Sequence, residues 1–268
     1  MTNLNFTVDK EKCIKCGLCV KDCISHIIET DDSGYPCVRD ESNCIGCQHC
    51  FAVCPKGAVS VFNKNSSEVE ICFDKPSPEQ LENLIKVRRS CRQYKQENID
   101  KKTLEKLKNI LNYVPTGVNF RGLHFSIVED KDKMANLKEK LYKKLRFLLK
   151  FIPLKGTINL YKKAILNGED VIFRNAPHMI VVSTDKKAPC ANIDPVIALS
   201  YFEMYAQSLG LGTLWCGLAF ATMPLSKDLM KELNIPKNYK LSYVMLFGYP
   251  NVSYSRPAKP DNYKIDIV

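Results

Sequence analysis

The sequence has no long apolar run: among its 268 residues, none approaches the ~18 successive apolar residues that a membrane-spanning helix needs. It has no Gly-x-Gly-x-x-Gly motif, the usual mark of a dinucleotide-binding loop. The first dozen residues are polar and of mixed charge, without the apolar segment of a secretory signal peptide. We therefore expect a cytoplasmic protein that is not embedded in a membrane.

Cysteine is scarce beyond residue 54, where only four of the thirteen cysteines lie. The other nine fall within residues 13–54. In a reducing cytosol, cysteines clustered in this way indicate a metal or redox site rather than disulfides.

The clustered cysteines repeat the spacing C-x2-C-x2-C-x3-C twice, with a period of 31 residues. One tight loop can present three thiolates to a [4Fe–4S] cluster, while the fourth cysteine serves the other cluster. Structural zinc is the alternative, but two complete sets of three plus one cysteines do not fit a zinc site. Cys37 fits no ligand position, and we expect it to be a small buried residue or a spare thiol rather than a ligand. The predicted ligands are Cys13, Cys16, Cys19 and Cys54 for one cluster, and Cys44, Cys47, Cys50 and Cys23 for the other.

Over residues 5–62 this pattern resembles bacterial two-cluster ferredoxins. One departure is Ile24, which stands where the full pattern has proline after the fourth cysteine. Ligation does not require that proline.

Charge is distributed unevenly along the chain. Residues 1–75 hold 8 Lys and Arg against 11 Asp and Glu, whereas residues 76–268 hold 31 against 18. An acidic first part and a basic second part suit a small electron carrier joined to a domain that binds phosphate or an acidic partner. A proline-containing break at residues 75–78 separates the two, so we expect domains at 1–75 and 76–268.

The second domain mixes helices and strands without strict alternation, which predicts an α+β fold. Ser77 with Gln80 is a capping box at one helix start, and Asp100 caps another helix. The pattern predicts helices near residues 78–87, 101–111, 133–151 and 194–209, and strands near 69–73, 123–129, 178–184 and 241–247.

Three short segments of this domain have the residue types of a ligand site. Residues 88–92 read Arg-Arg-Ser-Cys-Arg, which could hold an anion such as a phosphate. Residues 114–119 form a loop of small residues that ends in Asn119, and residues 210–217 read Gly-Leu-Gly-Thr-Leu-Trp-Cys-Gly. Each segment alone is weak evidence for a ligand site, because runs of arginine are usually solvated and a glycine often only ends a helix.

In this order the segments resemble the nitroreductase family of FMN flavoproteins, across residues 77–260. The resemblance rests on five landmarks: an Arg-Arg-Ser-x-Arg opening, a loop with Pro and Asn, an Ala-Pro step before a strand, the Gly-Leu-Gly-Thr-x-Trp-x-Gly segment, and a closing Gly-Tyr-Pro followed by Arg. Their residues are Arg88, Arg89, Ser90 and Arg92; Pro115, Thr116 and Asn119; Ala176 and Pro177; 210–217; and 248–250 with Arg256.

The resemblance implies a homodimer with FMN at the subunit interface. Arg88, Ser90 and Arg256 would hold the phosphate and ribityl chain, whereas Arg92 and Asn119 would face the ring. Backbone N–H groups of Trp215, Cys216 and Gly217 would lie near flavin N5. For the thiols of Cys91 and Cys216 we favour packing over redox chemistry. After the Asn the family often has Gln-Pro-Trp, and here residues 121–123 read Arg-Gly-Leu, in a loop that borders the substrate in relatives.

Residues 131–163 carry 11 Lys and Arg against 2 Asp and Glu, along with a helical stripe of leucines. A docked helix with a solvated outer face explains this segment, and a docking surface for an acidic electron donor is the alternative. No recognition motif accompanies the charge, so we do not expect nucleic acid binding.

Together these features predict a ferredoxin-linked flavin oxidoreductase that reduces a nitroaromatic, quinone or similar small-molecule acceptor. A free ferredoxin or NAD(P)H would be its electron donor. The alternatives are another flavin-dependent reaction on the same scaffold, such as reductive removal of a substituent, and an electron-transfer or redox-sensing module without a small-molecule substrate.

Overall fold

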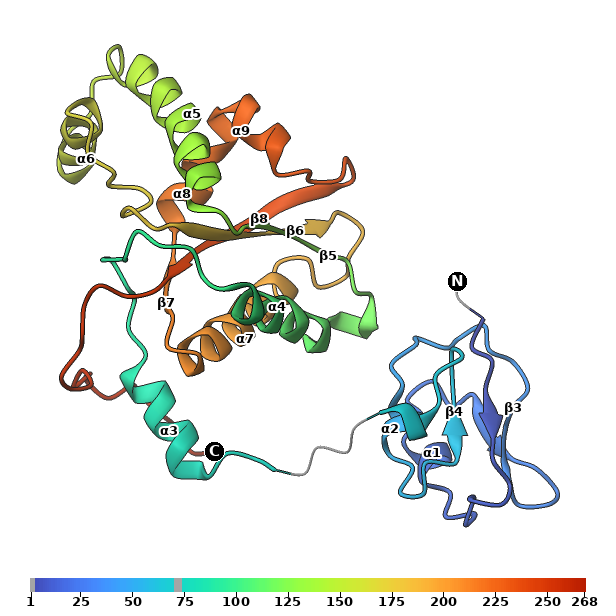
Figure 1. Ribbon diagram of the computed structural model, residues 1–268. Coiled ribbons are helices and arrows are strands. Elements are labelled where there is room, and N and C mark those ends of the chain that lie inside the picture. The colour runs from blue at the N-terminus through green and yellow to red at the C-terminus, as the bar shows by residue number, and fades with distance from the viewer. Residues whose placement is uncertain (1–2, 70–73) are drawn as a thin grey trace. The chain divides into compact units, whose positions relative to one another are not determined.

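The computed structural model describes residues 3–69 and 74–268, which form two compact units (Figure 1). The first unit comprises Met1–Lys75 with Val118–Phe120, and the second comprises Pro76–Gly117 with Arg121–Val268. The strand expected at residues 69–73 lies almost wholly outside the described residues.

The first unit is built from short elements around a small core. Leu4, Val59 and Val61 are buried in it. A unit of this size buries little apolar surface, so bound metal is a common source of additional stability in such domains. Its antiparallel strand pairs are β1 (Thr7–Val8) with β4 (Val59–Ser60) and β2 (Ile28–Thr30) with β3 (Pro36–Val38), and its helices are α1 (Leu18–Lys21), α2 (His49–Ala52) and the 3-10 turn η1 (Ser66–Glu68).

The second unit is organised around an antiparallel sheet with the strand order β5-β6-β8-β7. The strands are β5 (Leu123–Val128), β6 (His178–Asp185), β7 (Gly212–Trp215) and β8 (Tyr239–Gly248). Seven successive residues of β6 are buried, as expected for a central strand with both faces covered. β7 is an edge strand, so one of its edges can accept another segment of chain.

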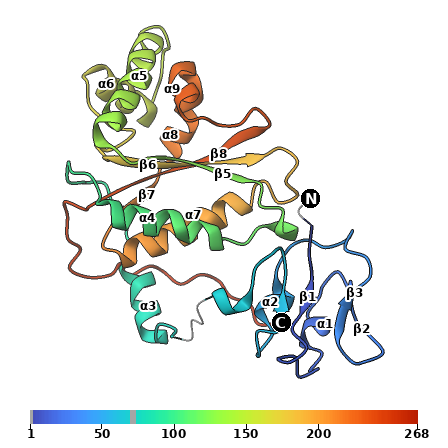
Figure 2. The ribbon, with the colours of Figure 1, turned by 45° about the vertical axis from the view of Figure 1, so that its right-hand side comes forward.

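Helices cover both faces of this sheet (Figure 2). Side chains alternate along β6: Met179 and Val181 join one hydrophobic cluster, and Ile180 and Val182 join the other. The first face is covered by α5 (Lys131–Leu149), α6 (Thr157–Leu166), α8 (Gly217–Thr222) and α9 (Lys227–Glu232), and the second by α4 (Lys101–Ile110) and α7 (Asp194–Ser208).

The helix starts follow from local sequence. Ser77 and Gln80 form the predicted capping box at α3 (Pro78–Val87), and the Asp100 side chain accepts a hydrogen bond from the N–H of Thr103 at the start of α4. Asp130 caps α5, which therefore begins two residues before the expected position. Short 3-10 turns complete the unit: η2 (Leu111–Tyr113), η3 (Gly117–Asn119) and η4 (Met223–Leu225).

Within the part of the chain that the structure describes, no helix combines the length and the apolar character needed to cross a membrane.

Candidate functional site

Two cavities in the first unit are each lined by four cysteines. In each cavity, three cysteines come from one C-x2-C-x2-C loop and the fourth comes from the other motif. This is the division that the crossed pattern assigns, and the ligation itself stays a prediction. The cysteines are Cys13, Cys16, Cys19 and Cys54 around one cavity, and Cys23, Cys44, Cys47 and Cys50 around the other.

Left-handed residues wind each cysteine loop. Gly17 precedes α1 with φ of 70°, and Gln48 precedes α2 with φ of 61°. Each helix is a single turn that holds the third cysteine of its motif, Cys19 in α1 and Cys50 in α2. The fourth cysteine follows the end of that turn, so it leaves the loop formed by the first three.

The sulfur atoms have distinct surroundings. The N–H of Ala58 donates a hydrogen bond to Sγ of Cys54 at 3.2 Å, a contact of the kind that tunes cluster potentials. Burial raises the pKa of Cys19, and it raises the pKa of Cys50 to about 11. Iron binds the thiolate form, so a cluster ligated here would offset this desolvation with metal charge.

The cysteines do not meet at one point. Across residues 3–69 and 74–268, no group of three His, Cys, Asp or Glu side chains is placed to hold a single metal ion. A [4Fe–4S] cluster does not require such convergence, because each of its four thiolates binds a different iron atom.

In the second unit, the segment after α3 lies along the outer edge of β7. Ser90 forms a parallel bridge with Thr213, and the N–H of Cys91 donates to the carbonyl of Thr213 at 2.8 Å. Main-chain polar groups of successive residues point to opposite edges of a strand, so the N–H of Trp215 points to the same edge as Thr213. The N–H of Cys216 instead donates to a carbonyl of β8 at 2.9 Å. Cys216 therefore has no spare backbone donor for a ligand at this edge.

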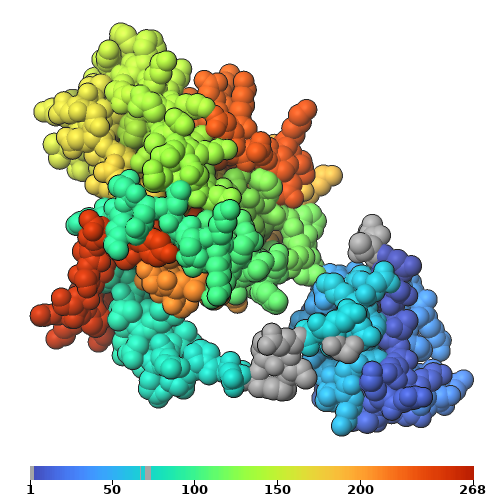
Figure 3. Space-filling view, in the orientation of Figure 1, coloured from blue at the N-terminus to red at the C-terminus, as the bar shows by residue number. Residues whose placement is uncertain are grey.

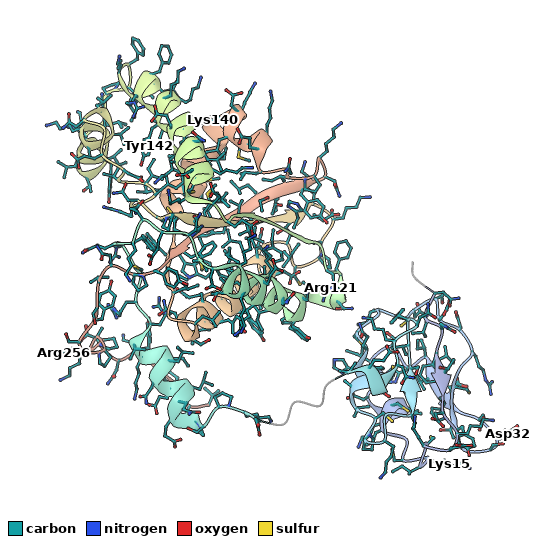
Figure 4. All side chains as sticks on the ribbon, in the orientation of Figure 1. Lys15, Asp32, Arg121, Lys140, Tyr142 and Arg256 are labelled. Atoms are coloured by element: carbon teal, nitrogen blue, oxygen red, sulfur yellow. The ribbon has the colours of Figure 1, made fainter. Side chains whose placement is uncertain are left out.

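The C-terminal segment runs beside the same residues. Main-chain hydrogen bonds of 2.9 Å join residues 93–95 with residues 249–251, and the Tyr254 hydroxyl donates to the carbonyl of Ser90 at 3.5 Å. In the space-filling view the red C-terminal segment lies against the teal residues that follow α3 (Figure 3). Arg256 is exposed on this segment (Figure 4). The fold thus gathers the predicted arginine segment, the tryptophan segment and the closing segment.

A buried carboxylate that the sequence analysis missed joins two of these segments. Glu203 of α7 is 7% exposed. Its Oε1 accepts hydrogen bonds from the Thr213 hydroxyl at 3.0 Å and from Nη1 of Arg88 at 3.3 Å. Its Oε2 accepts one from Nε1 of Trp215 at 3.0 Å. The available signal was a single acidic residue in the middle of a helix that otherwise reads as apolar.

The two thiols beside the predicted flavin contacts are buried and hydrogen-bonded. Cys91 donates to the carbonyl of Gln93 at 3.2 Å, and Cys216 donates to the carbonyl of Ile172 at 3.2 Å. Burial raises the pKa of both thiols, which keeps them protonated and poorly nucleophilic. The environment therefore agrees with packing rather than redox chemistry.

The loop with Pro115 and Thr116 lies elsewhere in the second unit. The N–H of Gly117 donates to Oδ1 of Asp194 at 3.0 Å, at the first residue of α7. Asp194 and Glu203 are nine positions apart on that helix, which corresponds to about 13 Å. One chain therefore does not bring this loop to Arg88. Asn119 is the last residue of η3, which follows this loop, and its contact with the flavin ring stays a prediction.

In comparisons with known proteins, each of the two parts of the chain matches a family model. The nitroreductase family model matches residues 85–249, and the 4Fe–4S dicluster domain model matches residues 12–58. The chain belongs to the nitroreductase family and carries an N-terminal 4Fe–4S ferredoxin domain. The predicted α+β fold class, with a ferredoxin-like domain before a nitroreductase-like domain, is thereby confirmed.

Individual relatives agree with this assignment. Iodotyrosine deiodinase of Thermotoga neapolitana is 24% identical over 189 residues, covering 68% of this chain and 94% of that protein. Ferredoxin-3 of a Nostoc species is 36% identical over 67 residues, covering 19% of this chain and 69% of that protein. Among solved structures, a nitroreductase with bound FMN from Desulfitobacterium hafniense matches with a TM-score of 0.57 and 26% identity, over 70% of this chain and 97% of that chain.

Proposed function

We propose that this protein is an FMN-dependent oxidoreductase in which electrons travel from two [4Fe–4S] clusters through FMN to a conjugated acceptor such as a nitroaromatic or a quinone. The observation that carries the proposal is that three segments lie side by side. Residues 88–92 lie along the outer edge of β7, and residues 248–256 contact the same segment and the residues that follow it. These are three of the five landmarks of the family, and they come from distant parts of the chain.

The cysteine cavities fit two iron–sulfur clusters. Each has four cysteines drawn from both motifs, and the first unit has little apolar core to fold around without them. The relative from Nostoc is a ferredoxin, which supports an electron-carrier role for this domain. We assign the two crossed sets of four cysteines as the ligands.

The arginines at the β7 edge fit the FMN phosphate. Arg88, Arg89 and Arg92 bring guanidinium groups to one short segment, and such groups bind phosphate through paired hydrogen bonds. We assign Arg88, Ser90 and Arg256 to the phosphate and ribityl chain.

The C-terminal end of β7 and the residues that follow it fit the flat flavin ring. Trp215 directs its N–H to the open edge of β7, as the strand alternation requires. At Gly217 an added Cβ would approach only the hydroxyl of Tyr243, at 3.5 Å, so the backbone there is accessible to a planar ligand. When bound, FMN supplies two-electron or one-electron transfer to the acceptor, and Arg92 would stabilise its reduced anionic form by charge.

A second copy of the chain would complete this site. Within one chain the loop with Thr116 is at the far end of α7 from Arg88, and we assign the two sets of contacts on one FMN to different subunits, as the resemblance implies. The solved relative from Desulfitobacterium hafniense binds FMN on the same fold, which supports the location.

Helix α3 has an apolar side suited to such a dimer. Leu81 and Ile85, one turn apart on the same side of the helix, are 46% and 56% exposed. No residue of α3, which the structure describes throughout, is buried. Because an amphipathic helix normally buries its apolar side, α3 has the character of an interface element.

The electron donor would be a free ferredoxin or NAD(P)H, and the protein would work in the cytoplasm. An acidic ferredoxin has a complementary surface in the basic residues 131–163.

Steady-state turnover tests the proposal. The purified protein, loaded with clusters and FMN, should reduce a nitroaromatic or quinone when supplied with reduced ferredoxin or a reduced viologen. If clusters and flavin both exchange electrons but no acceptor is turned over, the protein is an electron-transfer or redox-sensing module instead.

Reductive removal of a substituent is the second candidate reaction. It is favoured by the similarity to a protein named iodotyrosine deiodinase, which this chain matches over 94% of that protein's length. Release of halide from a halogenated phenol in the same assay, without reduction of nitro compounds, would favour this candidate.

A further inference from the structure

Glu203 is a buried charge whose partners fix its place. A carboxylate in an apolar surrounding is tolerated only when donors satisfy it. Here the hydroxyl of Thr213, the indole of Trp215 and the guanidinium of Arg88 all donate to it at 3.0–3.3 Å. The three donors come from the β7 edge and from the segment that lies along it.

The pairing leaves Arg88 with donors to spare. The side chain of Glu203 is 9% exposed, whereas that of Arg88 is 34% exposed. Arginine has five N–H groups in a rigid planar arrangement. Nη1 is directed at Glu203, the other N–H groups are not used in this pair, and the side chain is partly exposed to solvent. An anion arriving there meets an arginine that is already oriented.

We infer that Glu203 is a positioning residue of the FMN site: it holds Arg88 for the phosphate and Trp215 for the ring, so that both contacts are set before FMN binds. This inference rests on the proposed function. Glu203 does not touch FMN and acts through Arg88 and Trp215. Preorganisation of a flexible side chain strengthens binding because its ordering cost is met on folding.

The negative charge of Glu203 could also act directly on FMN, with an effect on binding opposite to that of positioning. The Glu203 carboxylate contacts Arg88, the residue that we assign to the FMN phosphate. Repulsion between the carboxylate and the phosphate would, by itself, weaken FMN binding. If charge dominated, removal of the carboxylate would tighten the complex. If positioning dominates, removal weakens it. The sign of the change therefore separates the two effects.

The variant Glu203→Gln tests the inference. The amide oxygen can still accept from Trp215 and the amide nitrogen can donate to Thr213, but Arg88 loses its ion pair. FMN added to the flavin-depleted, cluster-loaded full-length chain and followed by flavin fluorescence should show a Kd raised about tenfold. The emission maximum of Trp215, the single tryptophan of the chain, should stay unchanged.

A double-mutant cycle separates positioning from general destabilisation. In an Arg88→Gln background, Glu203→Gln should change the Kd for FMN by less than about twofold, because its effect passes through Arg88. Glu105→Gln makes the same chemical change at a side chain that is 61% exposed and paired with Lys108, and it should leave the Kd unchanged.

Several outcomes would overturn the inference. They are an unchanged or lower Kd in Glu203→Gln, or an equal loss in the Arg88→Gln background. If Glu203→Gln does not fold, Glu203→Asp is the second variant: it keeps the charge, but its carboxylate is one methylene further from Arg88, Thr213 and Trp215, and the Kd for FMN should again rise. Absence of FMN binding by the wild-type chain would refute the proposed function as well, which distinguishes the two failures.

Discussion

Cys23 lines the same cavity as Cys50, whereas the three cysteines that precede Cys23 in its own motif line the other cavity. Each cavity therefore draws on both halves of the first unit. A change at one fourth cysteine should act on the cluster held by the opposite motif, which is the reverse of what the linear sequence would indicate.

We expect Cys23→Ser to impair the cluster held mainly by Cys44, Cys47 and Cys50. A serine hydroxyl is a weaker ligand for iron than a thiolate, so that cluster should be lost or altered while the other remains. Electron paramagnetic resonance of the reduced protein, with iron analysis, measures the two clusters. Cys37→Ser is the matched control, because Cys37 lines neither cavity, and it should leave both spectra unchanged. Loss of only the cluster on the Cys13 motif would contradict the crossed ligation.

We expect Arg256→Ala to weaken FMN binding by about 1.5–3 kcal/mol, which is the range for one charged hydrogen-bonding contact. The segment that carries Arg256 runs beside Ser90, whose carbonyl accepts a hydrogen bond from the Tyr254 hydroxyl at 3.5 Å. Fluorescence titration with FMN gives the change. Lys259→Ala removes an exposed cation from the same segment and should have little effect. An unaltered affinity in Arg256→Ala would remove this residue from the site.

We expect Ile85→Glu to convert the proposed dimer into monomers. The change places a charge in the middle of the apolar side of α3, where Ile85 is 56% exposed in a single chain. Burying an unpaired charge at an interface costs about 3–5 kcal/mol, which opposes association. Sedimentation analysis measures the mass, and FMN content should fall with it. Glu82→Ala, on the same helix and paired with Lys86, should stay dimeric. A dimeric Ile85→Glu variant would place the interface elsewhere.

The local features of this fold could be predicted from the sequence because their causes are local. Ser77 and Asp100 cap helices through hydrogen bonds to residues three positions further on. The cysteine motifs are equally local. Glu203 could not be assigned a role in this way, because its partner Arg88 is 115 residues away and only the fold brings them together.

The position of the Thr116 loop relative to Arg88 could not be predicted from the sequence either. A resemblance can name the residues that a family uses, but it does not say which of them one chain brings together. The hydrogen bond from Gly117 to Asp194 anchors that loop to the start of α7, while Arg88 contacts the same helix nine residues later. Distances of this kind depend on how segments pack, which local patterns do not encode.

Removal of residues 1–75 should leave a dimer that binds FMN but no longer accepts electrons from ferredoxin. The second unit has its own sheet and two hydrophobic clusters, so it contains a complete core. Three measurements on the truncated chain test this prediction: its mass in solution, its flavin content, and its turnover with a reduced viologen compared with reduced ferredoxin. A truncated chain that fails to fold would show that the first unit has a structural role.

Acid should destabilise the second unit through His178. This side chain is fully buried, its Nε2 accepts a hydrogen bond from the N–H of Ile99 at 3.2 Å, and its Nδ1 has no hydrogen-bond partner among the described residues. Burial lowers the pKa of His178, and nearby backbone groups and the carboxylates of Asp130 and Glu129 only partly oppose it. The folded state therefore binds this proton less readily than the unfolded chain, in which histidine has a pKa of about 6.5.

The sign of the effect follows from linkage. Because the unfolded chain binds more protons in this range, the contribution of His178 is fully present above about pH 6.5 and is lost as the pH falls from there toward the folded-state pKa. The loss is at most about 1.4 kcal/mol per pH unit. Denaturant unfolding at pH 5.5 and 7.5, followed through the single tryptophan Trp215, measures it. In His178→Gln the amide oxygen can still accept the hydrogen bond from Ile99. In this variant the difference in the free energy of unfolding between pH 5.5 and pH 7.5 should shrink, whereas in His124→Gln it should stay as in the wild type. An identical difference in wild type and His178→Gln would assign the acid sensitivity to other groups.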